Sequence, residues 1–112
     1  MRNVLLRIER DKKKKEKFSL YLNSVFPGVQ VRTKFNETND LWIKSVVQRD
    51  DKDPRALDMV GTGLLQAIQI LAYVSNYNPK ILLLDEPDAH LHPSNQRLLS
   101  QTLDVISKET DT

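Results

Sequence analysis

One short stretch constrains the fold more than any other. Residues 81 to 93 read ILLLDEPDAHLHP. Four consecutive aliphatic side chains without a polar interruption are typical of a short strand that is covered on both faces inside a parallel sheet. We therefore expect a strand over residues 80 to 85, which would expose apolar side chains and both edges unless neighbouring strands cover it. The sequence predicts an α/β fold that needs further strands to complete its sheet.

The rest of the chain alternates helical and extended patterns. Apolar spacing predicts an amphipathic helix over residues 11 to 26, ended by a Pro-Gly pair. Two β-rich runs, residues 29 to 35 and 41 to 48, flank a polar turn and predict a hairpin. A largely apolar helix follows the VGTG sequence, and we expect it to pack against a sheet. A last helix begins at Pro93, where the missing N–H costs no hydrogen bond.

Composition excludes several protein classes. A chain of 112 residues with 39% hydrophobic and 29% charged residues has the profile of one small folded domain. No apolar run is long enough to span a membrane and the first residues lack a signal-peptide pattern, so we expect a cytoplasmic protein without a membrane partner. The absence of cysteine excludes disulfides, thiol catalysis and cysteine-ligated zinc.

Charge is distributed unevenly along the chain. Residues 1 to 56 hold 14 Lys or Arg and 8 Asp or Glu, whereas residues 57 to 112 hold 3 and 7. The run Lys12 to Lys15 concentrates the basic charge. A solvated helix surface explains such a run, and contact with nucleic-acid phosphates is the alternative. Any contribution of this run to nucleic-acid binding should be salt-sensitive and independent of base sequence.

Two adjacent carboxylates end the expected buried strand. A carboxylate at that position suits Mg²⁺, because this ion prefers oxygen ligands and retains part of its water shell, and Asp85 fits that role. A neighbouring carboxylate can orient or deprotonate the water that attacks a phosphate, and Glu86 fits that one. The other interpretation is a strand end capped by acids for solubility, which is common for an Asp-Glu pair alone.

With its four aliphatics, its DEP triplet and its HLHP loop, ILLLDEPDAHLHP resembles the Walker B strand and D-loop of ABC-type ATPases. The spelling is similar to that of the soluble branch containing the OLD (overcoming lysogenization defect) nucleases and RecF-like proteins. Upstream, GTGLLQ at 61 to 66 resembles the signature motif of this family. A helix start with a glycine and open amides is also a sensible anion site by itself. A glycine-flanked helix start without such a role is the alternative.

The resemblance implies a set of roles. The parent ATPase would bind ATP and Mg²⁺ and pair head to head with a second ATPase head, giving a homodimer. Thr62 and Gly63 would contact nucleotide held by the partner, Asp85 would hold Mg²⁺, and Glu86 would act on the attacking water. His90 and His92 would lie in the D-loop at the dimer contact. An attached effector, such as a nuclease acting in DNA repair or phage defence, is the implied target of the conformational change.

The sequence also departs from the family pattern. Leu64 stands where the transporter signature has a second glycine, and no G-x-x-x-x-G-K-[ST] phosphate loop occurs. The switch histidine of the family has no counterpart, because His90 and His92 precede the last helix. We therefore expect part of an ATPase head, with a helical basic segment (1–28), a hairpin and loop (29–59), and a signature, Walker B and D-loop segment (60–112). Alone it should be inactive, and a non-catalytic dimerisation module is the alternative function.

Other side chains have simpler interpretations. Trp42 is most simply a packing residue of a strand, with stacking on a nucleic-acid base as the alternative. Gln66 and Gln69 are expected on the helix surface. His90 and His92 with Asp88 are a weak zinc candidate, since no further ligand lies nearby in the sequence.

Overall fold

The computed structural model describes residues 1–38, 40–50 and 52–112, so Asn39 of the expected turn and Asp51 of the charged loop lie outside the described residues. The described residues form the predicted helices and hairpin, together with additional short elements. In chain order they are α1 (Arg2–Glu9), α2 (Lys12–Val25), β1 (Val29–Lys34), β2 (Lys44–Arg49), β3 (Arg55–Ala56), the 3-10 turn η1 (Leu57–Met59), α3 (Thr62–Tyr77) and α4 (Pro93–Thr110).

The first two helices are separated by a helix cap. The basic segment is helical as expected, but it breaks after α1 because Asp11 adopts an extended conformation and accepts hydrogen bonds from the N–H groups of Lys13 and Lys14. An N-cap of this kind satisfies donors that the first helical turn leaves without partners. The apolar face of α2, which includes Phe18 and Leu22, is buried.

The hairpin prediction is confirmed. The three strands form an antiparallel sheet in the order β1-β2-β3, and the β1–β2 register pairs Val29 with Arg49 and Lys34 with Lys44. The inner face is buried, and there the hydroxyls of Thr33 and Ser45 lie 3.1 Å apart in a hydrogen bond. This bond satisfies two polar groups that the core would otherwise leave unpaired.

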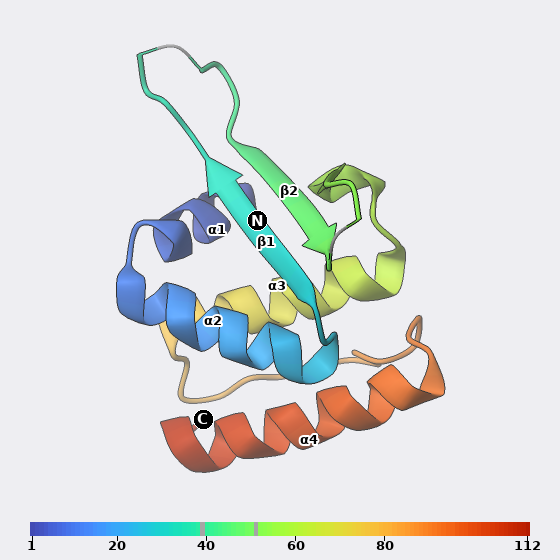
Figure 1. Cartoon of the computed structure of the whole chain (residues 1–112). Helices are drawn as coiled ribbons and strands as arrows, with labels where there is room; N and C mark the ends of the chain where they lie inside the picture. The colour runs from blue at the N-terminus through green and yellow to red at the C-terminus, as the bar shows by residue number, and fades with distance from the viewer. Residues whose placement is uncertain (39, 51) are drawn as a thin grey trace.

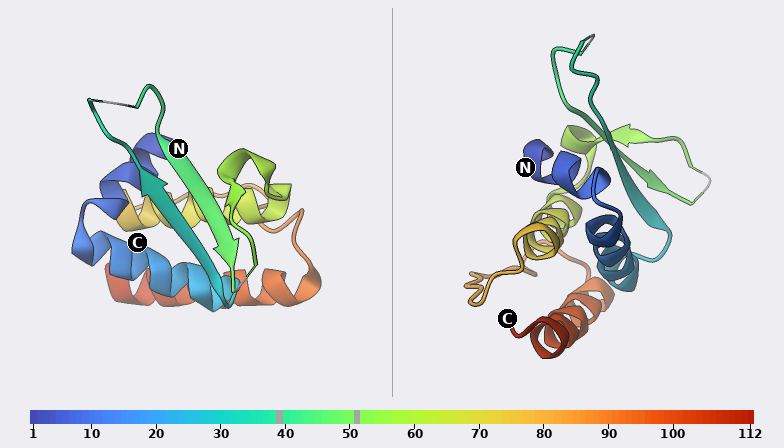
Figure 2. Two further views of the ribbon diagram at one scale, coloured as in Figure 1. Left: turned by 45° about the horizontal axis from the view of Figure 1, so that its top comes forward. Right: turned by 90° about the vertical axis from the view of Figure 1, so that its left-hand side faces the viewer.

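The elements stack in layers. Figure 1 shows the hairpin crossing over α1 and α2, with α3 behind these two helices and α4 below them. The end-on view in Figure 2 separates the sheet from α3, with α1 and α2 between them. Contacts agree, because α3 packs against α1 and α2, and α4 packs against α2. No helix in the described part of the chain is both long and apolar enough to cross a bilayer.

Two local predictions differ from the structure. Residues 80 to 85 are assigned to no strand, and α3 packs on helices where a sheet was expected. The cause is shared: a buried parallel strand exists only beside neighbouring strands, and the described residues supply only the hairpin sheet. Exposure alternates over the first three residues, since Ile81 and Leu83 are 78% and 89% exposed while Leu82 packs against the core, but Leu84 is also exposed, at 38%. These first three residues have the side-chain pattern of a strand without the pairing.

Candidate functional site

The signature segment forms the first turn of α3. Gly61 is the N-cap with φ −63° and ψ 154°, and no side chain caps this turn. Thr62, the first helical residue, is exposed. Because the first N–H groups of a helix lack intrahelical partners and carry partial positive charge, an exposed turn of this kind can receive an anion.

Gly63 has a packing reason to be glycine. It is buried, and a Cβ placed on it would lie 2.5 Å from the backbone oxygen of His90 and 2.8 Å from Cδ2 of Leu91. Both distances are below van der Waals contact. The missing side chain therefore lets the D-loop backbone rest directly on the signature helix, and the two predicted motifs meet within one chain.

The paired carboxylates face solvent. Asp85 and Glu86 are both exposed, and they follow the extended segment at the start of a tight turn. Glu86 has φ +46°, in the left-handed region that residues other than glycine rarely adopt. Its carbonyl accepts a hydrogen bond of 3.2 Å from the N–H of Ala89. The turn thus sets Glu86 in a backbone conformation distinct from that of an ordinary strand end.

Helix α4 anchors the rest of this turn. Gln96 Nε2 donates to the Asp88 carbonyl at 2.9 Å, and the Leu91 N–H donates to the same carbonyl at 3.1 Å. Asn95 Nδ2 donates to the Val25 carbonyl at 2.9 Å and so ties the start of α4 to the end of α2. These contacts fix the D-loop at both sides of its exposed tip.

The two histidines differ in role. His92 is the N-cap of α4, and its Nδ1 accepts a hydrogen bond from the Ser94 N–H at 3.3 Å. His90 is exposed, and it is its backbone oxygen that lies over Gly63. His92 thus has a structural function that the sequence pattern does not indicate.

No group of three or more His, Cys, Asp or Glu side chains in the described ranges could hold a metal ion. The zinc candidate of His90, His92 and Asp88 gains no support from this geometry. Asp85 still suits Mg²⁺ chemically, because protein sites for this ion commonly use one or two carboxylates and take their other oxygens from phosphate and water. Asp85 would serve as one such ligand beside a bound nucleotide.

The lysine run is partly committed to internal contacts. Lys14 Nζ donates to Asn76 Oδ1 at 3.1 Å, which links α2 to the end of α3. Lys15 forms an ion pair of 2.8 Å with Glu9. Lys12 and Lys13 are exposed in the first turn of α2. Two of the four lysines therefore link α2 to neighbouring helices. Neither interpretation of the run, as a solvated surface or as a nucleic-acid contact, predicted these links.

Two further side chains differ from expectation. Trp42 is 72% exposed, so its interpretation as a packing residue is wrong. Gln66 is half-buried and its Oε1 has no hydrogen-bond partner among the described residues, whereas Gln69 lies on the surface as predicted. Strand alternation cannot predict the exposure of Trp42, because β2 begins only at Lys44.

Comparisons with known proteins indicate the family and the fold of this chain. A family model described as "AAA domain, putative AbiEii toxin, Type IV TA system" matches residues 4–112. A search of curated proteins found no match.

Solved structures of SMC ATPases share the fold. A chain from work on the ATP-driven dimerization and DNA-stimulated activation of SMC ATPases superposes with a TM-score of 0.73 at 19% identity, over 98% of this chain and 69% of that one. The Smc head domain of Pyrococcus furiosus, with an extended coiled coil and bound to the C-terminal domain of ScpA, gives 0.69 at 21% identity, over 88% and 26%. The predicted fold, an α/β fragment that resembles part of an ATPase head, is confirmed.

Proposed function

Because this chain belongs to that family of AAA domains, whose model matches nearly its whole length, we propose that it supplies the signature, Walker B and D-loop part of a composite ATP site. The site forms when two ATPase heads associate head to head. The observation that carries the proposal is the contact of Gly63 with the His90 backbone, which joins two of the three motifs into one surface. The exposed Thr62 at the start of α3, where no side chain caps the helix, supports an anion contact beside it.

The proposed chemistry is mainly positioning and electrostatics. Thr62 and the open amides of α3 bind the γ-phosphate of nucleotide held by the opposite head. Glu86 orients or deprotonates the attacking water, and its exposed carboxylate is accessible for this role. Asp85 provides an oxygen ligand for Mg²⁺, which when bound neutralises charge on the phosphate oxygens.

The phosphate-binding loop must come from elsewhere in the assembled site. No G-x-x-x-x-G-K-[ST] occurs in these residues, so most of the affinity for ATP lies outside them. We propose that this loop belongs to another part of the same ATPase head. The DEP-x-x-HLHP spelling favours the soluble OLD and RecF-like branch, and with it a nuclease or other effector acting in DNA repair or antiviral defence.

A non-catalytic dimerisation module is the second candidate. The apolar Ile81 and Leu83 are exposed on an extended segment, and such a segment favours pairing with another strand whether or not nucleotide binds. In this function the signature and D-loop surfaces hold two proteins together and Glu86 has no chemical task.

Glu86→Gln in the assembled ATPase separates the two functions. The isosteric amide cannot take a proton, so turnover should stop while ATP binding and the ATP-bound dimer persist. Asp85→Asn should in addition weaken Mg²⁺-dependent nucleotide binding. The measurements are phosphate release and dimer formation with and without ATP. Full activity of Glu86→Gln contradicts the catalytic assignment, and dimers that form equally well without ATP favour the module.

A further inference from the structure

The outer face of the β1–β2 hairpin carries a row of cations. In the antiparallel register Lys34 is directly opposite Lys44, and Arg32 is opposite Val46. Arg32, Lys34 and Lys44 are exposed, and alternation along β1 sets the first two on the same face. Arg32 Nη2 donates to Gln30 Oε1 at 3.4 Å. No ion pair joins these three cations to a carboxylate in the part of the chain that the structure describes.

The pairing of Lys34 with Lys44 is unfavourable for the isolated hairpin. Directly opposite residues in an antiparallel pair have Cβ atoms about 5 Å apart, and like charges at that separation destabilise the sheet. An anion lying across the pair would replace repulsion with attraction to both ammonium groups. The register therefore favours a ligand that brings negative charge to this face.

An exposed aromatic ring lies beside these cations in the sequence. Trp42 is 72% exposed and lies two residues before Lys44, where β2 begins, and its neighbour Leu41 is 87% exposed. Aromatic rings that water surrounds on a basic surface are stacking platforms for unpaired bases. The hairpin thus combines the two features that single-stranded nucleic acid needs, namely phosphate charge partners and a stacking surface.

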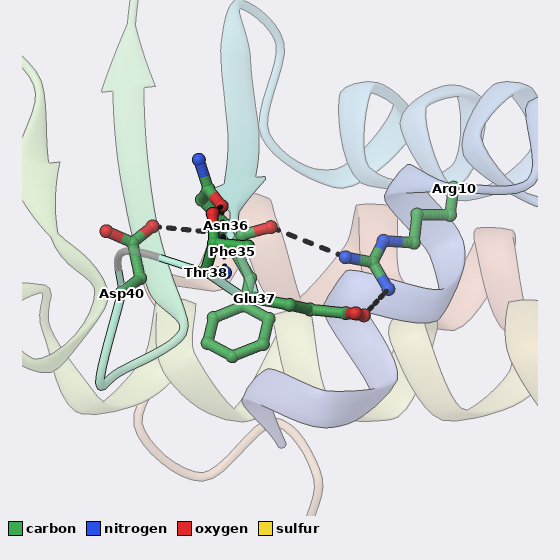
Figure 3. A network of polar contacts seen from close by, with 6 residues as sticks. All are labelled: Arg10, Phe35, Asn36, Glu37, Thr38 and Asp40. Atoms are coloured by element: carbon green, nitrogen blue, oxygen red, sulfur yellow. Dashed lines mark hydrogen bonds and ion pairs between the residues drawn. The ribbon is translucent and has the colours of Figure 1, made fainter.

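The acidic residues of the hairpin loop are engaged in contacts of their own. Figure 3 shows the side chain of Arg10, the residue that follows α1, reaching toward the loop, where it donates to Glu37 Oε1 at 3.5 Å and to the Phe35 carbonyl at 3.4 Å. Asp40 Oδ2 accepts a hydrogen bond of 2.9 Å from the Asn36 N–H. Both carboxylates therefore have local partners, and the same contacts brace the loop that carries the exposed ring.

We propose that the exposed hairpin cations Arg32, Lys34 and Lys44, together with the exposed ring of Trp42 that precedes β2, bind single-stranded nucleic acid. The cations contact successive phosphates, and the indole stacks on an unpaired base. A duplex fits less well, because its bases are stacked on one another and show no free face to the ring. This surface does not depend on the proposed ATPase activity, since its residues lie on the hairpin and binding needs no nucleotide.

The single tryptophan of the chain gives a direct readout. Titration of the full chain with oligothymidylate in the absence of ATP should quench its fluorescence, because the base stacks on the indole. A duplex of equal length should bind more weakly. Vesicles of phosphatidylcholine with phosphatidylserine, and a poly-glutamate peptide, should leave the emission unchanged. The proposal is overturned if duplex binds as tightly as oligothymidylate or more tightly. It is also overturned if the emission changes with vesicles or with poly-glutamate but not with oligothymidylate.

Substitutions test the residues with labelled oligothymidylate. Trp42→Ala should weaken binding about 5- to 150-fold, the loss of one stacked base, whereas Trp42→Phe should retain most of the affinity. Lys34→Gln with Lys44→Gln should lower the slope of log affinity against log salt by about 1.4, from two lost phosphate contacts on a single strand. This double variant should fold, because it removes a repulsion.

The matched control removes the same charge from α2. Lys12→Gln with Lys13→Gln also changes two exposed lysines, and these lie in the run that the sequence first suggests for nucleic acid. We expect the control to keep the salt slope of the unmodified chain. A slope that falls in the control and not in the hairpin variant overturns the assignment, as does unchanged affinity in Trp42→Ala.

Discussion

Gly63→Ala tests the contact on which the candidate site depends. The added Cβ would lie 2.5 Å from the His90 backbone oxygen, and a backbone atom cannot move aside as a flexible side-chain end can. Overpacking of this kind costs about 1–3 kcal/mol, and the better helix propensity of alanine offsets at most about 1 kcal/mol. We expect a net loss of about 1–2 kcal/mol in the free energy of unfolding.

Gly61 provides the matched control. It is two residues away at the same helix start, its φ is negative, and a Cβ there meets nothing within 4 Å. Gly61→Ser adds a side chain that is also a favourable N-cap, so its stability should equal or slightly exceed that of the unmodified chain. The pair separates a specific clash from a general intolerance of side chains at this helix start.

Urea unfolding followed by circular dichroism measures the stability, and hydrogen exchange locates the change. In Gly63→Ala the amides of Ala89 and Leu91, which donate within the D-loop turn, should exchange faster than in Gly61→Ser. If Gly63→Ala unfolds at the same urea concentration as Gly61→Ser with unchanged exchange at both amides, Gly63 does not hold the D-loop against α3.

Three further predictions concern other parts of the chain. His92→Ala should cost about 1 kcal/mol by removing the N-cap of α4, and His92→Asn should restore most of it in thermal unfolding. Burial, with the nearby charge of Glu109, raises the pKa of the Tyr21 phenol above its ordinary value of 10.0. The unfolded chain therefore loses this proton first as pH rises, so stability should fall above about pH 10, and Tyr21→Phe should show a smaller alkaline loss. Replacing both Ile81 and Leu83 by Lys should reduce self-association in analytical ultracentrifugation without lowering the melting temperature, because both side chains are exposed; a lowered melting temperature would show that they stabilise the fold.

The sequence predicted most of the local structure because local signals decide it. The helices at 12–25 and 93–110 and the hairpin were expected from apolar spacing and turn residues, and they form close to the predicted positions, except that the second hairpin strand begins at Lys44 and not at residue 41. The strand that the same local signals predict at 80–85 does not form in the structure, because strand formation also depends on partners distant in sequence. The segment is extended and its aliphatic residues Ile81, Leu83 and Leu84 are exposed, so the missing component is the pairing with neighbouring strands.

The candidate site shows the same division between local and distant information. The spacing of carboxylates and glycines pointed to Asp85, Glu86 and the start of α3, since each signal lies within a few residues. Position 63 requires glycine because of the His90 carbonyl, which is 27 positions away in the sequence. The spacing of apolar residues cannot predict such a contact. For the same reason the cap made by His92 was missed, because histidine is an uncommon N-cap and the HLHP spelling alone suggests a different role.

The contact at Gly63 also restricts how the proposed composite site can move. Thr62 is adjacent to Gly63 in the first turn of α3, and His90 and Leu91, at the end of the turn that begins at Glu86, lie against the same glycine. If a bound phosphate moves the start of α3 toward a second head, the D-loop must therefore move with the helix. Otherwise a gap would open beside the buried Gly63. Close-packed interiors resist such a gap. Binding at Thr62 and the position of Glu86 would then be coupled through one backbone contact, and Gly63→Ala should disturb both together.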